Sequence, residues 1–263
     1  MSEAMKIRVA VLGRGRMGQA IERCIAESED LDLAGIWVRN CTVSENEEQS
    51  ALSDDIFTVL SSAQVAIDFT LPEVTECVIR AAAKAKIPLV CGVSGITASN
   101  NQLMLAMSEE IPILHDRNMS LGVAVLQQML RLAGAALGDE FAAEIHETHH
   151  VHKIDAPSGT ALQLGESLAA SRKQVFEEVY HYDPCGKTKP TMDQIHFEVT
   201  RRGEVPGEHT VLFKSAHESL SLLHKVDDRR VFAVGAIKAA RWLVGQQPGL
   251  YSMQDLIRKS MQE

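Results

Sequence analysis

Four histidines and a lysine fall within eight residues, from His146 to Lys153. Histidine titrates near neutral pH and can shuttle protons, and a lysine can donate a proton when burial or a neighbouring cation makes it more acidic. In a straight strand, residues i and i+4 lie about 13 Å apart. His149 and Lys153 therefore meet at one substrate only if the chain bends between them. The pattern predicts acid–base catalysis at such a bend.

A zinc site is the alternative use of the same histidines. On an extended strand, His146, His150 and His152 share one face, whereas His149 and Lys153 share the other. No cysteine or paired carboxylate stands nearby to complete a closed tetrahedral set of ligands. Acid–base chemistry is therefore favoured, and no metal is expected.

The residues after the lysine are typical of an anion-binding site. Ser158, Gly159 and Thr160 look like a helix N-terminus, with Pro157 near its first turn. Main-chain amides and hydroxyls at such an end bind carboxylates, and the hydroxyls can cap the helix at the same time. A small acidic substrate is expected.

A glycine-rich motif follows the first predicted strand and opens the first predicted helix. Gly13 permits a tight turn, Gly15 lets the backbone approach a pyrophosphate, and Gly18 allows close packing of helix on strand. The spacing predicts a dinucleotide site in this context. The motif consists of Gly13, Arg14, Gly15, Arg16, Met17 and Gly18.

The second predicted strand ends in Val38 and Arg39, where dinucleotide-binding proteins commonly carry an acid for the ribose 2′-hydroxyl. An arginine here can pair with a 2′-phosphate, and Arg14 and Arg16 are near in sequence. NADPH is the expected cofactor, with NADH also possible. A solvated surface arginine is the alternative interpretation of Arg39.

The elements that position these residues differ between the two halves of the chain. Strands alternating with helices predict a doubly wound parallel sheet in the first half. In the second half, consecutive strands predict an antiparallel or mixed sheet, and so an α+β domain. The first-half strands are expected at 6–13, 31–38, 64–69, 87–91 and 111–114, and the first-half helices at 17–28, from about 72, and at 98–109. In the second half, strands are expected at 144–152, 194–200, 209–215 and 219–224, and helices at 119–137, 158–171, 231–244 and 253–261.

Composition and charge disfavour several classes of protein. The 263 residues carry a net charge of −9, which disfavours nucleic acid as a partner. No export signal or apolar stretch long enough to span a membrane is visible, so a cytoplasmic protein without a membrane partner is expected. The five cysteines are scattered without CxxC spacing, which predicts reduced thiols.

The stretch from His149 to Ala161, HHVHKIDAPSGTA, resembles the signature of the dihydrodipicolinate (4-hydroxy-tetrahydrodipicolinate) reductase family of bacterial lysine biosynthesis. The resemblance covers essentially the whole chain. Weaker matches support it at 16–18, 68–70, 92–95, 118–123, 207–210 and 232–236.

The resemblance implies roles for individual residues in the reduction of 4-hydroxy-tetrahydrodipicolinate to tetrahydrodipicolinate. His149 is implied as the catalytic acid/base and Lys153 as the proton donor. The substrate carboxylates are implied to bind His150, Ser158, Gly159, Thr160 and Arg229. The implied cofactor contacts are the motif 13–18 together with Arg39, Thr70, Gly92, Val93, Ser94, Asp116, Arg117, Asn118 and Met119.

The family fold implies two domains and a homotetramer. Residues 1–119 and 230–263 are implied to form the Rossmann-type dinucleotide-binding domain, and 120–229 an inserted substrate-binding and tetramerisation domain with an open mixed sheet.

The chain departs from the family pattern in four places. The glycine motif is one residue short, and Val38 replaces a frequent acid. Val93 and Ser94 replace two threonines, so that one hydroxyl is lost, and the charged pair Asp116–Arg117 replaces small residues or proline.

Two other functions stay open from the sequence. One is a Rossmann-type reductase of another small imino or keto acid, and the other is a non-catalytic NADP-binding sensor. Substrate profile and turnover distinguish them from the reductase.

Overall fold

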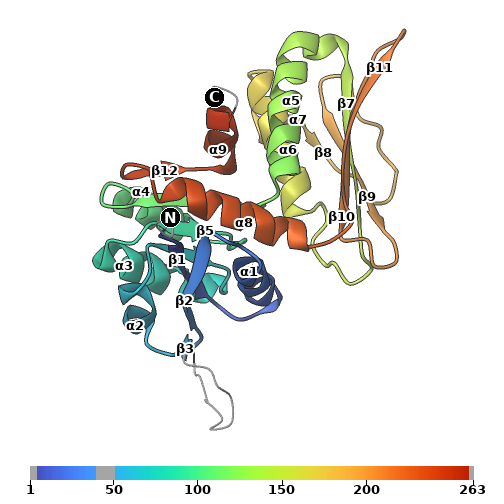
Figure 1. The fold of residues 1–263 in the computed structure, drawn as a ribbon. Coiled ribbons are helices and arrows are strands. Elements are labelled where there is room, and N and C mark those ends of the chain that lie inside the picture. The colour runs from blue at the N-terminus through green and yellow to red at the C-terminus, as the bar shows by residue number, and fades with distance from the viewer. Residues whose placement is uncertain (1–4, 40–50, 261–263) are drawn as a thin grey trace. The chain divides into compact units, whose positions relative to one another are not determined.

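The computed structural model describes residues 5–39 and 51–260, and the chain forms two compact units. The first unit comprises Met1–Leu121 and Arg230–Glu263, and the second comprises Gly122–Arg229. The first unit is thus built from both ends of the chain, as the colours of Figure 1 show.

The first unit is a parallel sheet of seven strands in the order β12-β6-β5-β4-β1-β2-β3. The doubly wound parallel fold predicted from strand–helix alternation is confirmed. The strands are β1 Ile7–Leu12, β2 Leu31–Trp37, β3 Leu52–Ser53, β4 Val65–Asp68, β5 Leu89–Cys91, β6 Pro112–His115 and β12 Gly249–Tyr251.

Helices cover both faces of this sheet. α1 packs with α8 on one face, and α2, α3 and α4 pack together on the other (Figure 1). The helices are α1 Arg16–Ala26, α2 Ile56–Ser61, η1 Pro72–Val74, α3 Thr75–Ala85, α4 Ala98–Met107, α8 Arg230–Leu243 and α9 Met253–Ser260.

The C-terminal segment is tightly joined to the first unit. A side chain at Gly235 would overlap the carbonyl of Met119, so only glycine lets α8 approach this closely. Arg241 on α8 forms an ion pair of 2.6 Å with Asp30. The parallel-sheet fold of the first unit is therefore incomplete without the residues that follow 229.

The second unit is a mixed sheet of five strands in the order β11-β10-β7-β9-β8. β10 runs antiparallel to β7 and β11, whereas β9 is parallel to β7 and β8, which confirms the mixed sheet expected. The strands are β7 Ala142–His149, β8 Tyr180–His181, β9 Ile195–Arg201, β10 Gly207–Lys214 and β11 Ser219–Val226, and the helices are α5 Leu121–Leu137, η2 Gly138–Glu140, α6 Gly159–Ser171 and α7 Phe176–Val179.

Length and composition alone would let the segment Leu121–Glu140, which contains α5, cross a membrane. Its inner side, however, contributes Leu126 and Leu130 to a core that also contains Ile145 of β7 and Leu164 of α6. Core helices of globular proteins have the same composition. α5 is therefore accounted for by packing on the sheet.

Four of the cysteines lie in the described residues, and all four are free thiols. Cys24 and Cys91 are buried, whereas Cys77 and Cys185 are exposed. Cys41 lies outside the described residues.

A buried acid at the end of β4 makes stability depend on pH. Asp68 is fully buried, and its Oδ1 accepts hydrogen bonds from the amide and hydroxyl of Thr70 at 2.9 and 2.7 Å. Burial raises the pKa of Asp68 to about 6. An unfolded aspartate has a pKa near 3.9, so the folded chain holds this proton more tightly. Its contribution to the free energy of unfolding is complete below about pH 4 and is lost as pH rises through 6.

We expect Asp68→Asn to become more stable relative to the natural chain as pH rises from 4 to 7. Asparagine keeps an acceptor oxygen for Thr70 and carries no charge to bury. The relative gain is about 2–3 kcal/mol across this range, at 1.36 kcal/mol per pKa unit. Urea unfolding at fixed protein concentration and at several pH values measures it. A difference that does not vary with pH contradicts the prediction.

Candidate functional site

Two groups of residues form candidate sites, one in each unit. The first surrounds the carboxyl ends of β1, β2 and β4, where open α/β sheets bind ligands. The second lies where β7 ends in the mixed sheet.

The glycine motif forms the turn from β1 into α1. Gly13 has a φ of +92°, which favours glycine. A side chain at Gly18 would overlap the Gly13 carbonyl. The turn therefore depends on glycine at both positions, as the spacing predicts. Gly15 precedes the first residue of α1, so the helix N-terminus faces this loop.

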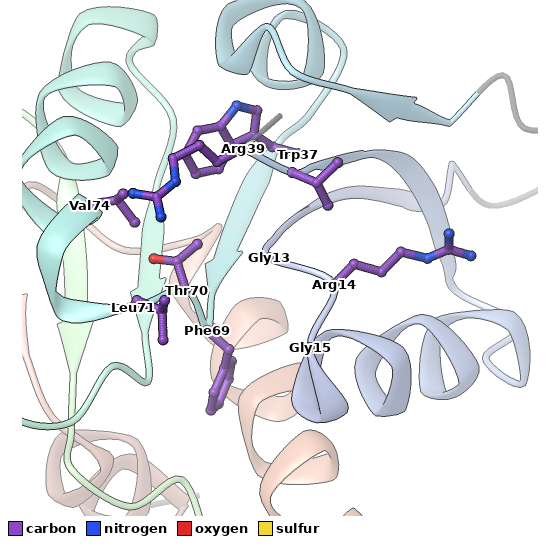
Figure 2. A pocket seen from close by; sticks show the side chains of 10 residues that line it. Gly13, Arg14, Gly15, Trp37, Arg39, Phe69, Thr70, Leu71 and Val74 are labelled. Carbon is purple, nitrogen blue, oxygen red and sulfur yellow. The ribbon is translucent and has the colours of Figure 1, made fainter. Parts of the chain in front are cut away.

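A cavity of about 360 Å³ opens beside this turn (Figure 2). In Figure 2 the Arg39 side chain extends toward Val74 and Thr70, whereas that of Arg14 points away from them. Arg14 Nε instead lies 3.7 Å from Glu22 Oε2. The lining residues are Gly13, Arg14, Gly15, Trp37, Val38, Arg39, Phe69, Thr70, Leu71 and Val74.

A second cavity of about 350 Å³ shares Phe69, Thr70 and Leu71 with the first. Two cavities that share a wall suit an extended dinucleotide, with one end in each. The second cavity is lined by Met17, Phe69, Thr70, Leu71, Pro72, Gly92, Val93, Ser94, Arg117, Asn118, Met119 and Phe232.

Three of the expected cofactor residues do not line either cavity. Arg16 is exposed at the start of α1, and Gly18 is buried in the helix–strand contact. Asp116 is buried, and its carboxylate accepts hydrogen bonds from the amides of Asn118 and Met253, each at 3.3 Å. Asp116 thus fastens the start of α9 to the segment after β6, which gives this unusual charge a structural role.

The apolar part of the cavity wall was missed from the sequence. Trp37, Leu71 and Val74 line the first cavity, and Phe232 on α8 lines the second. Phe232 stands in a stretch that resembles the family, but the local sequence does not place α8 beside the glycine motif.

In the second unit, the candidate site begins where β7 ends. The strand was expected to continue to His152, which is wrong, because it ends at His149. The chain then turns, with the Lys153 amide bonded to the His150 carbonyl at 3.2 Å and the Val151 amide bonded to Gly203 at 3.1 Å. The histidine face expected for a zinc site therefore does not form, and the bend expected between His149 and Lys153 is present.

Alternation along β7 directs two polar side chains into the unit's interior. Glu147 and His149 share the buried face with Ile145, and both are almost completely buried. His149 Nδ1 lies 3.0 Å from Glu147 Oε2. Burial opposes ionisation of Glu147, but the contacts with His149 and Ser158 prevail and lower its pKa to about 2. Glu147 is therefore a carboxylate at neutral pH.

Arg201 at the end of β9 joins this carboxylate to the turn. Its guanidinium lies 3.2 Å from Glu147 Oε1 and donates to the carbonyls of Lys153 and Asp155. Lys153 Nζ forms an ion pair of 2.8 Å with Asp155. Although burial alone would raise the pKa of Asp155, Lys153 lowers it. Arg201 was missed because a lone arginine at a strand end gives no local signal.

His209 on β10 completes the buried cluster. Its ring meets that of His149 edge to face, with centroids 5.1 Å apart. Burial, followed by the charge of His149, lowers the pKa of His209 to about 3, so this ring is neutral. Glu147, His149 and His209 each offer a ligand-type atom within 4.8 Å of the others, a grouping that can also hold a metal ion.

The predicted helix N-terminus forms as α6, with Ser158 as the N-cap. The Ser158 hydroxyl accepts from the Ala161 amide at 3.2 Å and lies 3.3 Å from His209 Nε2, and its amide donates to Glu147 at 2.9 Å. The Ser158 amide and hydroxyl are thus both engaged by groups of the protein itself. Gly159 and Thr160 are half-buried in the first turn.

His150 and Arg229 are both half-buried in this unit. Burial, followed by the charge of Arg229, lowers the pKa of His150. His150 Nδ1 is buried without a hydrogen-bond partner among the described residues. Arg229 is therefore near enough for its charge to act on the His150 ring, and a cation near a buried polar atom that lacks a partner suits a carboxylate.

Comparison with known proteins assigns the whole chain to one family. Residues 7–119 match the family described as dihydrodipicolinate reductase, N-terminus, and residues 122–257 match dihydrodipicolinate reductase, C-terminus. The 4-hydroxy-tetrahydrodipicolinate reductase of Pseudoalteromonas translucida is 37% identical, and the match covers 96% of this chain and 98% of that protein. The enzyme of the same name from Rhodopseudomonas palustris is 38% identical, with 98% of each chain covered.

A solved structure agrees with the fold. Dipicolinate-bound dihydrodipicolinate reductase from Paenisporosarcina sp. TG-14 superposes with a TM-score of 0.76 at 21% identity, covering 95% of this chain and 99% of that one. The family models and the full-length relatives lead to one conclusion: the chain belongs to the dihydrodipicolinate reductase family, an oxidoreductase family whose members are 4-hydroxy-tetrahydrodipicolinate reductases.

Proposed function

We propose that this chain reduces 4-hydroxy-tetrahydrodipicolinate to tetrahydrodipicolinate with NAD(P)H, in the diaminopimelate route to lysine. The observation that carries the proposal is the grouping of His149, Lys153 and the N-terminus of α6 around one turn in a member of this family. The reaction adds a hydride and a proton to the ring and releases the hydroxyl group as water.

Each group at the turn has a part in this proposal. His149 acts as the acid/base and Lys153 donates the proton to the ring carbon next to the one reduced. The carboxylates bind between the Arg229–His150 pair and the first turn of α6, formed by Ser158, Gly159 and Thr160. Ser158 contributes by capping the helix, since its amide donates to Glu147 and its hydroxyl oxygen accepts from the Ala161 amide.

We propose NADPH as the preferred cofactor, held in the two joined cavities of the first unit. The glycine-dependent turn and the start of α1 suit a pyrophosphate. The segments Gly92–Ser94 and 117–119 line the cavity proposed for the nicotinamide, which supplies the hydride when bound. Arg39 is proposed to pair with the 2′-phosphate.

Replacing Arg39 with alanine tests this preference. We expect the KM for NADPH to rise about 10- to 100-fold and that for NADH to change less than threefold, because a charge-assisted pair contributes about 1.5–3 kcal/mol. Arg80→Ala, on the exposed side of α3, is the matched control. An equal rise for both cofactors would contradict the role in selectivity.

We also propose that the second unit carries the subunit contacts of a homotetramer in the cytoplasm. One face of its sheet lies in the core. The other face presents half-buried His146, Thr148 and Leu212 and the exposed Leu223. Sedimentation equilibrium measures the oligomeric state of the chain, and a monomer at micromolar concentration would contradict the proposed tetramer.

The activity is tested by following NADPH oxidation at 340 nm. The substrate is generated in the same cuvette by the synthase that precedes this reaction in the route to lysine. Rapid oxidation that depends on the synthase is expected. Oxidation with other imino or keto acids but not with this substrate would indicate a different reductase. Tight binding of NADPH without turnover on any of them would indicate a sensor.

A further inference from the structure

We propose that Glu147 is the positioning residue of His149: it holds the imidazole with a proton on Nδ1 and ties that ring to the N-terminus of α6. The proposal deepens the function proposed above, because it assumes that His149 takes part in proton transfer. It assigns a task to a buried acid that has no part in the function proposed above.

The first support is the contact between the two side chains. Glu147 Oε2 and His149 Nδ1 form an ion-pair contact of 3.0 Å, and neither of these buried atoms has a hydrogen bond to any other group among the described residues, so each is available to the other. The Glu147 side chain is 0% exposed, so water does not reach its carboxylate. An ionised carboxylate only accepts hydrogen bonds. A proton shared at this distance can therefore sit only on Nδ1, which in the proposal leaves Nε2 as the nitrogen that exchanges protons.

The second support is that the carboxylate cannot turn. Its other oxygen, Oε1, accepts from the Ser158 amide at 2.9 Å and from Arg201 at 3.2 Å. Two donors fix Oε1, and this leaves Oε2 directed at His149. Because Ser158 caps α6, one carboxylate connects the acid/base on β7 with the helix proposed to bind the substrate carboxylates.

The third support is that the surroundings fix the imidazole ring. The neutral ring of His209 packs edge to face on His149, with centroids 5.1 Å apart. On the Nε2 side, a Cβ atom at Gly207 would lie only 3.2 Å from that nitrogen, so glycine keeps this edge clear. His209 carries no charge that would compete for Glu147. The carboxylate is therefore free to stabilise an imidazolium at His149.

Glu147→Gln separates positioning from packing, because the two side chains are nearly equal in size. Ser158 and Arg201 both donate, so they retain the amide oxygen and turn the amide nitrogen toward His149. That nitrogen donates a hydrogen bond, so Nδ1 must accept it and the ring proton moves to Nε2. We expect histidine ¹⁵N chemical shifts of the full chain to show this change of tautomer at His149.

The kinetic expectation follows from the tautomer. With Nε2 protonated and Nδ1 facing a donor, the ring neither accepts a proton nor forms a stable imidazolium. kcat should fall about 10²-fold, the lower end of what a general acid–base group contributes, while the dissociation constant for NADPH stays within twofold. Glu147→Asp retains the charge and should retain the Nδ1–H tautomer with a smaller loss of kcat.

Glu144→Gln is the matched control. Glu144 lies on the same strand and contacts a histidine two residues later, His146, at 2.8 Å, but on the opposite face of β7. The control should leave the His149 signals and kcat unchanged. Circular dichroism and NADPH binding verify that every variant is folded.

The outcomes separate this inference from the proposed function. If the natural chain has reductase activity and Glu147→Gln leaves both the His149 tautomer and kcat unchanged, the inference is wrong. If the natural chain lacks the activity, the tautomer change still tests the contact itself. Stoichiometric zinc in the purified chain that disappears in Glu147→Gln would overturn the inference, since a metal and not a proton would then join the pair.

Discussion

Replacing His149 with glutamine is expected to lower kcat about 10³-fold while the dissociation constant for NADPH stays within twofold of that of the natural chain. Glutamine fills a similar volume and can still contact Glu147, but it does not exchange protons. General acid–base groups contribute about 10²–10⁴-fold to rate. The cavities proposed for the cofactor are lined by residues of the first unit, which this change leaves intact.

The control for this prediction is His152→Gln. His152 lies three residues away, is 72% exposed and pairs with Glu204 on the surface. Its replacement should alter kcat less than twofold. Rates are measured from NADPH oxidation under substrate saturation, and binding from cofactor fluorescence. A His149→Gln variant as active as the natural chain would remove His149 from the mechanism.

Replacing Lys153 with methionine is expected to lower kcat about 10²-fold, the second large effect. Methionine matches the length of the side chain and removes the ammonium. The ammonium is held at the turn, because the Lys153 side chain is only 21% exposed and pairs with Asp155 at 2.8 Å. The turn itself should persist, since Arg201 binds the main-chain carbonyl of Lys153 and not its side chain.

A second lysine in the same unit offers the control for this change. Lys225 also pairs with an aspartate two residues later, Asp227, at 3.4 Å, but it is 58% exposed on β11. Lys225→Met should retain the activity of the natural chain. Should both variants lose activity equally, the effect belongs to net charge and not to proton donation.

Local patterns in the sequence were sufficient for the parts of the site that lie within a few residues. Glycine spacing after a strand predicts the turn at Gly13, and a serine before glycine predicts the N-cap at Ser158. The structure has both. These features depend on backbone sterics and on main-chain amides, which the chain itself provides over short distances.

Long-range pairing was not predictable from one sequence. His209 lies opposite Glu147 because β10 pairs antiparallel with β7, and Arg201 lies opposite His149 because β9 pairs in parallel. The register between distant strands is set by packing of the whole sheet. The end of β7 was misjudged for a related reason, since the turn after His149 is closed by a hydrogen bond from Val151 to the distant Gly203.

The return of the chain at Arg230 has a consequence for biosynthesis. The second unit, Gly122–Arg229, is continuous and is complete when its last residue leaves the ribosome. The first unit begins earlier but still lacks α8, β12 and α9 at that moment, so the apolar surface that α8 covers on the sheet stays open. During synthesis the second unit can therefore complete its fold before the first unit does, although the first unit begins earlier in the chain.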